Sequence, residues 1–137
     1  MTEFAGERRK ARTRAVAKIA VQSSEAKPYD QSESPELVEI HITETFSGDI
    51  EGESQVRALE VLRDDRSASM ISVQRFRGKL GGRHGTFVLQ GMEAVEYGRI
   101  SAKWAVVPGS GTDELRGLRG EGGFGKGSEG TLEYWFE

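Results

Sequence analysis

Four polar side chains stand out because their spacing places them on strand faces that are otherwise apolar. Alternate residues of a β-strand point to the same face, and several short stretches of the chain alternate apolar and polar residues. Two carboxylates, an amide and a phenol fall on the apolar side of this alternation: Glu44, Glu60, Gln74 and Tyr134. A carboxylate held among apolar groups has a raised pKa and can act as a general acid or base near neutral pH. Glu44 is therefore the candidate catalytic residue.

A pocket for a small molecule is the site that such residues would form. A largely apolar lining with a few polar groups is typical of small-ligand pockets. The candidate ligand-binding residues share these inward faces: Phe46, Glu60, Met70, Gln74, Phe76, Trp104 and Tyr134. The alternative is that the polar members lie at strand ends, where water reaches them, or form structural ion pairs with Arg75 or Arg119.

The sequence does not indicate metal or cofactor chemistry. It contains no Cys and two His residues, His41 and His84, whereas catalytic zinc sites usually take two or three His ligands. The pattern G-x-G-x-x-G occurs over 120–125 and 125–130, but no helix follows either copy. Since a dinucleotide site needs that helix, we interpret these glycines as turns. We expect no cofactor and no metal.

The elements that must position the candidate residues are β-strands. From Leu37 onward, short alternating stretches are separated by Gly or Asp, as in sandwiches and barrels. We expect strands near residues 13–22, 37–46, 53–63, 68–78, 84–91, 98–107, 119–125 and 130–136, a loop over 23–36 and one helical turn within 110–117. Eight strands with hairpin connections predict an all-β fold, a closed and mostly antiparallel eight-stranded barrel.

Glycine and side-chain parity refine this prediction. Glycine accounts for 18 of the 137 residues, and it adopts positive φ without strain. We therefore expect turns at Gly81–Gly82, Gly91, Gly98, Gly109–Gly111 and Gly130. In the stretch 98–107 the inward side chains should be Ile100, Ala102, Trp104 and Val106.

Length and charge restrict the partners. A chain of 137 residues fits one domain, and we expect a basic, disordered tail over 1–12 followed by a single domain over 13–137. The first 20 residues hold six Lys or Arg against two Glu, while the remainder is acidic. An acidic body repels nucleic acid, and no aromatic side chains are interleaved with the basic ones for base stacking. Because there is neither a membrane-spanning run nor a signal sequence, we expect a cytoplasmic protein with no nucleic-acid or membrane partner.

Three blocks of the sequence carry a family resemblance. Residues 45–53, 78–90 and 106–122 resemble an uncharacterised bacterial family of single-domain proteins with the allene oxide cyclase-like β-barrel. The resemblance implies an eight-stranded barrel but no established activity. The plant cyclases with this barrel bind a fatty-acid epoxide and guide its ring closure without a cofactor, and none of their catalytic residues has a match here. The bacterial family commonly has Glu at the position of Gln74, so an amide there carries no acid or base role.

Three functions remain open. The first is binding of a small apolar molecule inside the barrel, and the second is a cofactor-free cyclase or isomerase that acts on a hydrophobic substrate and uses Glu44 as base or electrostatic guide. The third is a structural or interaction protein with a packed core, forming a homo-oligomer through outward residues that include Trp135. The strand number does not choose among them, because an eight-stranded barrel is just wide enough to be filled or to hold one small ligand.

Overall fold

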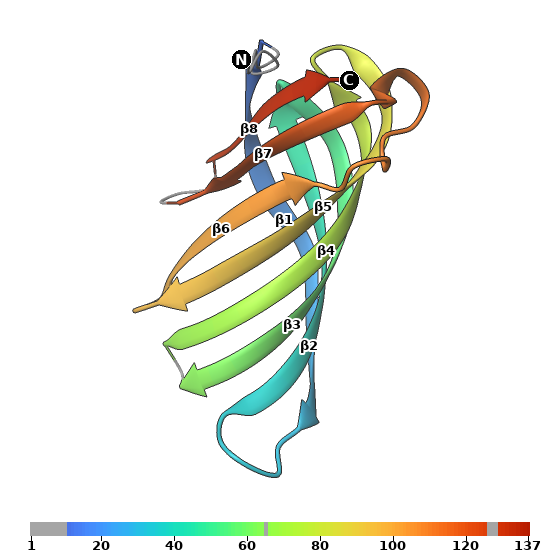
Figure 1. The fold of residues 1–137 in the computed structure, drawn as a ribbon. Helices are drawn as coiled ribbons and strands as arrows, with labels where there is room; N and C mark the ends of the chain where they lie inside the picture. Colours follow the sequence, from blue (N-terminus) through green and yellow to red (C-terminus); the bar gives the residue numbers. More distant parts are fainter. Residues whose placement is uncertain (1–10, 65, 126–128) are drawn as a thin grey trace, which may run out of the picture.

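Eight antiparallel strands form a ring in the structure, a computed structural model that describes residues 11–64, 66–125 and 129–137. Each strand pairs with the next one along the chain, and β1 also pairs with β8 (Figure 1). The strands are β1 (Thr13–Asp30), β2 (Glu36–Gly48), β3 (Ile50–Asp64), β4 (Ser67–Leu80), β5 (Arg83–Glu96), β6 (Arg99–Val106), β7 (Leu118–Phe124) and β8 (Glu129–Phe136). The prediction of an all-β ring of eight antiparallel strands is confirmed.

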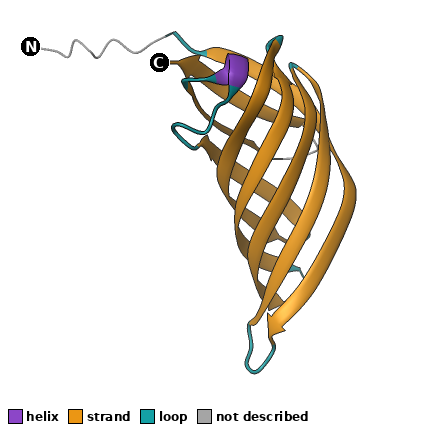
Figure 2. Ribbon diagram, turned by 90° about the vertical axis from the view of Figure 1, so that its right-hand side faces the viewer, coloured by secondary structure: helices purple, strands orange, loops and turns teal. Residues whose placement is uncertain are grey.

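An apolar core fills one end of this ring. The inward side chains there are almost fully buried: Ala15, Ala17, Phe46, Ile50, Phe76, Leu80, Phe87, Leu89, Val106, Leu118, Leu132 and Tyr134. Phe76 is the centre of an aromatic group, with its ring centroid 5.5 Å from that of Phe46 and 5.0 Å from that of Phe87. A 3-10 turn, Asp113–Leu115, confirms the expected helical turn and lies at this end (Figure 2), where Leu115 is completely buried. We call this end the filled half.

The other end of the ring is open. β1 pairs with β8 only over Thr13–Lys18, and β6 pairs with β7 only over Ala102–Ala105. The remainder of β2 to β6 extends beyond β7 and β8 (Figure 1). Val21 has the inward parity of β1 and yet is 60% exposed, because no strand covers it from the other side. We call this end the open half.

The length of β1 corrects one prediction. The segment 23–36 is rich in Ser and Pro and was expected to be a loop, but β1 continues through it to Asp30. The reason is the stagger of the ring. The line of directly paired residues that starts at Ala15 runs around all eight strands and returns to β1 at Ala26. Because the strands are tilted in this way, β1 must be long enough to pair with β8 near its start and with β2 further along.

Three inward positions also differ from expectation. Gly91 and Gly130 were expected in turns, but they lie within β5 and β8. A Cβ on Gly130 would lie 3.0 Å from the indole of Trp104, so this glycine makes room for a neighbour. The glycines of the first G-x-G-x-x-G copy likewise lie mainly in β7 rather than in a turn. Ile100 was expected to be buried and is 44% exposed, because it lies at the end of the open half.

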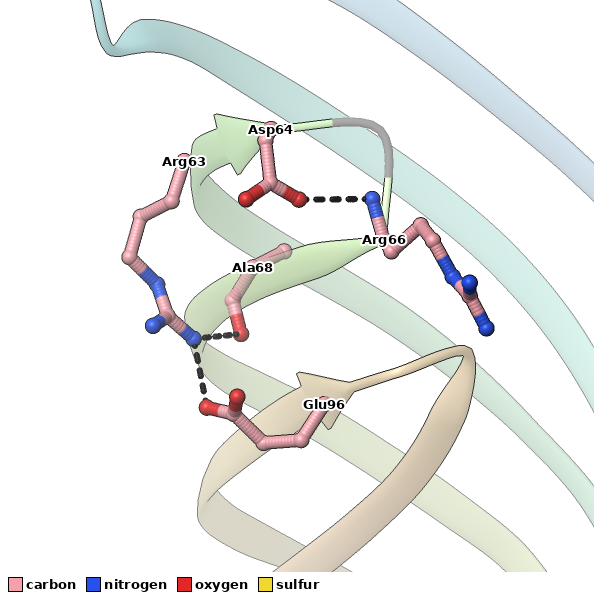
Figure 3. A network of polar contacts seen from close by, with 5 residues as sticks. All are labelled: Arg63, Asp64, Arg66, Ala68 and Glu96. Carbon is pink, nitrogen blue, oxygen red and sulfur yellow. Dashed lines mark hydrogen bonds and ion pairs between the residues drawn. The ribbon is translucent and has the colours of Figure 1, made fainter.

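Hydrogen bonds join the hairpin turns at the end of the open half (Figure 3). The Arg63 guanidinium donates to the carbonyl of Ala68 at 3.1 Å and pairs with the Glu96 carboxylate at 2.8 Å. Asp64 accepts from the backbone N–H of Arg66 at 2.8 Å. The β3–β4 hairpin is thereby connected to the end of β5, which holds the rim of the open half together.

The glycine pair Gly52 and Gly78 provides a test of the filled half. These residues lie opposite each other on β3 and β4, and a Cβ on Gly78 would lie 2.8 Å from the Cα of Gly52 and 3.0 Å from the ring of Phe76. We expect Gly78→Ala to lower the free energy of unfolding by ~1–3 kcal/mol, as overpacking does. Urea denaturation measures it. Gly98→Ala is the matched control, because Gly98 also has a positive φ and, among the described residues beyond its chain neighbours, no atom lies within 4 Å of the added Cβ; equal stability of the two variants would contradict this packing.

Candidate functional site

Three carboxylates point into the interior of the open half from three strands. Glu44 lies on β2, Glu60 on β3 and Glu93 on β5, and each is partly buried. The side chains around them are mainly apolar and also partly exposed: Ile40, Ile42, Leu62, Met70, Val95 and Phe124. The inward orientation expected for Glu44 and Glu60 is what the strand register shows.

A row of polar side chains crosses this wall from β2 to β5. Ser54 lies directly opposite Glu44, and its hydroxyl donates to Oε1 of Gln74 at 2.5 Å. Ser72 precedes Gln74 by two residues on the same face of β4, and its hydroxyl donates to Oε2 of Glu93 at 2.6 Å. The two serines and the glutamine are buried. Two carboxylates thus stand at the two ends of a row of polar side chains in an otherwise apolar wall, and we call these five residues the polar row.

Glu93 is the functional candidate that the sequence analysis missed. Its Oε2 is held by Ser72, whereas its Oε1 is buried and has no hydrogen-bond partner in the part of the chain that the structure describes. Gly91 makes space for this carboxylate, because a Cβ there would lie 2.7 Å from Glu93 Oε2 and 3.1 Å from Trp104 Cδ1. The signal was present in the alternation of β5. Glu93 was missed because a turn was expected at Gly91, so the predicted strand ended there.

Burial changes the acidity of all three carboxylates. Desolvation raises the pKa of Glu44, and the negative charge of Glu93 raises it further. Desolvation also raises the pKa of Glu93, although its hydrogen bond from Ser72 opposes the change. The pKa of Glu60 is raised by burial. A raised pKa keeps a carboxyl protonated to a higher pH than an ordinary Glu, which favours a role as a general acid.

The remaining predicted site residues divide between the two halves. Met70 lies between Glu60 and Glu93 in the pairing of β3, β4 and β5, so these three adjoin one another. Trp104 lies at the boundary, with its ring centroid 6.5 Å from Phe46 and 5.8 Å from Phe124.

Three of the predicted residues are not on the open half. Phe46, Phe76 and Tyr134 are buried in the filled half, where Tyr134 packs edge-on against Phe136 at 6.0 Å. Arg119 pairs with Glu137 at 3.1 Å rather than with an inward carboxylate.

Other features of the described residues bear on function class. They contain no group of three or more His, Asp or Glu side chains that could hold a metal ion. Among them, no helix is long and apolar enough to cross a membrane.

At the start of β1, Arg12 stacks on Trp135 with 4.4 Å to the ring centroid and pairs with Glu121 at 2.8 Å. Residues 1–10 of the expected basic tail lie outside the described residues.

The raised pKa values predict how stability depends on pH. Because burial raises the pKa values of Glu44 and Glu93 above the ordinary 4.5, we expect the folded protein to bind more protons at these groups than the unfolded chain above that pH. Their contribution to stability is therefore present at low pH and is lost as the pH rises through the folded-state values. We expect Glu44→Gln to raise the free energy of unfolding at neutral pH by more than the ~0.5 kcal/mol typical of surface changes, and to flatten its pH dependence.

The double variant distinguishes coupling from simple burial. Glu44→Gln and Glu93→Gln each relieve the same repulsion, so their combined effect on unfolding free energy should be smaller than the sum of the single effects. Urea denaturation between pH 4.5 and 8 measures these values, and Glu53→Gln on the exposed face of β3 is the control. Additive effects, or a pH dependence that no variant changes, would contradict the proximity of the two carboxylates.

Comparisons with known proteins agree on one family. Residues 15–137 match the family model described as a protein of unknown function (DUF3224). A crystal structure of a protein of unknown function from the DUF3224 family, from Shewanella oneidensis MR-1, is similar over 93% of this chain and 98% of that chain, with a TM-score of 0.73 and 27% sequence identity. No curated protein matches the chain. These comparisons therefore indicate a fold and a family but no activity. The chain belongs to the DUF3224 family.

Proposed function

We propose that the open half binds a small, largely apolar molecule that carries a hydrogen-bond donor. The observation that supports this function is the buried Oε1 of Glu93, which has no partner among the described residues. A buried polar atom without a hydrogen bond costs stability, and a hydroxyl or amine on a ligand would supply the missing bond. The polar row holds this carboxylate in place through Ser72.

The surroundings of Glu93 favour an apolar ligand body. Met70 and Phe124 are partly exposed on the inner face, and Trp104 lies beneath them at the boundary with the filled half. Partly exposed apolar side chains in a concave interior gain free energy when a ligand covers them, by about 25 cal/mol per Å² of apolar surface. On this proposal the fold is an allene oxide cyclase-like barrel in which the filled half is the floor of the ligand site.

A fluorescent apolar amine tests this site directly. The chain has two Trp residues, so Trp135→Phe leaves Trp104 as the only indole. We expect the neutral dye N-phenyl-1-naphthylamine to quench Trp104 emission by energy transfer. Met70→Gln should weaken the binding about tenfold, close to 1.4 kcal/mol, because it removes apolar contact from the inner face.

The neighbouring residue supplies the matched control. Ile71 follows Met70 on β4 and faces outward, where it is 57% exposed. Ile71→Gln should leave the affinity for the dye unchanged. If Ile71→Gln weakens binding and Met70→Gln does not, the dye binds to the outer surface and the proposed site is wrong; absence of any quenching would also count against it.

The second candidate function is cofactor-free proton transfer on a hydrophobic substrate, as in an isomerase or a cyclase. It is favoured by two inward carboxylates, Glu44 and Glu93, whose pKa values are both raised by burial, that of Glu44 also by the charge of Glu93. One carboxylate accepts a proton while the other, still protonated, donates one. The apolar walls of the open half hold the substrate and exclude part of the water, which strengthens both steps.

Base-catalysed opening of 5-nitrobenzisoxazole tests this chemistry without knowledge of the natural substrate. A carboxylate oxygen takes the proton from C3, the C–H electrons form the nitrile, and the N–O bond breaks to give 2-cyano-4-nitrophenolate. We expect the protein to exceed the rate of free acetate, with a pH–rate inflection above the ordinary Glu value of 4.5.

The variants separate a site reaction from surface catalysis. Glu44→Gln and Glu93→Gln should each lower kcat more than they change KM, and the exposed control Glu53→Gln should leave both constants unchanged. A rate equal to that of acetate, or one that all three variants lower alike, would contradict proton transfer in the open half.

A further inference from the structure

The outer face of the open half carries a row of exposed apolar side chains between two opposite charges. Glu39, Leu59, Ile71, Met92 and Lys103 are paired in direct succession across β2 to β6. We call these five residues the outer row. Its three central members are 45%, 57% and 69% exposed. Exposed apolar residues that adjoin one another mark an interaction surface.

Two grooves flank the outer row. One of about 770 Å³ separates it from the outward residues Arg57, Val73, Gln90 and Ala105. The other, of about 690 Å³, separates it from Val61, Ser69, Ala94 and Ser101. Inward residues such as Ser72 and Gly91 form the floor of the first groove between the two rows. The apolar residues of the outer row therefore form a ridge that is accessible from both sides.

The charges of the outer row are complementary to those of a second copy of the row that runs in the opposite direction. Glu39 stands at one end and Lys103 at the other, with β4 and its Ile71 in the middle. Lys103 makes no ion pair within the described residues, and Glu39 uses Oε2 to contact His41 at 2.7 Å. A two-fold axis parallel to β4 reverses the order of the outer row in a second copy, so that Glu39 is on the same side as the partner's Lys103 and Leu59 is on the same side as the partner's Met92.

We propose that this face is the interface of a homodimer in which the two outer rows pack end for end. Ile71 lies on the two-fold axis against its own counterpart, and the two Glu39–Lys103 pairs close the ends. An isologous interface requires such a self-complementary patch. A membrane-binding surface would instead be flanked by basic residues at both ends. The dimer leaves the open half accessible, because the outer row lies on the opposite side of the sheet.

Charge reversal tests both the face and the orientation. Sedimentation velocity across a concentration series should show a monomer–dimer equilibrium for the full chain. Glu39→Lys and Lys103→Glu should each raise the dimer Kd at least tenfold, and the double variant should restore it. Lys18→Glu on β1, outside the outer row, is the control and should leave the Kd unchanged. Circular dichroism establishes that each variant is folded.

A position on the axis supplies a second, independent readout. The chain has no Cys, so Ile71→Cys introduces a single thiol. A short bismaleimide should link two copies through it, whereas Ala20→Cys on β1 should give no linked dimer. A wild-type protein that is monomeric throughout, or a dimer unaffected by charge reversal, would overturn the proposal. Single reversals that weaken the dimer without rescue by the double variant would overturn the end-for-end orientation.

Discussion

The stagger of the strands around the ring is the constraint on which the rest of the structure depends. A line of paired residues that leaves β1 at Ala15 returns to it at Ala26, so β1 pairs with β8 over Thr13–Lys18 and with β2 from Ala17 to Asp30. β7 and β8 are short and complete the ring only near the start of β1. The remaining length of β1 to β6 forms a curved sheet with an accessible inner face. One geometric requirement thus produces both a filled half and an open half.

We propose that the two halves divide stability and function between them. The filled half buries an aromatic group around Phe76 under the 3-10 turn, which provides a rigid floor. The open half places Glu44 and Glu93 in a partly dry interior, where their charges cost stability. Proteins retain such costly groups at functional sites, because a perturbed pKa is what acid–base chemistry and ligand recognition require. Ser72 of the polar row reduces this cost by donating a hydrogen bond to Glu93.

Much of this fold could be predicted from the alternation of apolar and polar residues along the chain, and the predictions that were wrong have a common cause. The class, the number of strands and the inward side of β6 around Trp104 follow from local periodicity. The length of β1 could not be predicted, because its composition favours a loop and only pairing with β2 makes it a strand. The turn expected at Gly91 was also wrong, because this glycine makes space for Glu93 on the same strand and for Trp104 on the neighbouring strand β6. The alternation of inward and outward residues correctly predicted that Glu44 and Glu60 point inward, but it does not indicate which end of the ring is filled.

The proposed site is tested most directly by a pH titration of the side-chain carboxyls by 13C NMR in protein labelled at Glu. We expect the resonances of Glu44 and Glu93 to titrate above the ordinary Glu value of 4.5, and Glu93→Gln to move the midpoint of Glu44 toward that value. If both midpoints lie at the ordinary value, or if that of Glu44 is the same with and without the Glu93 charge, the two carboxylates do not share one interior and the proposed site does not exist.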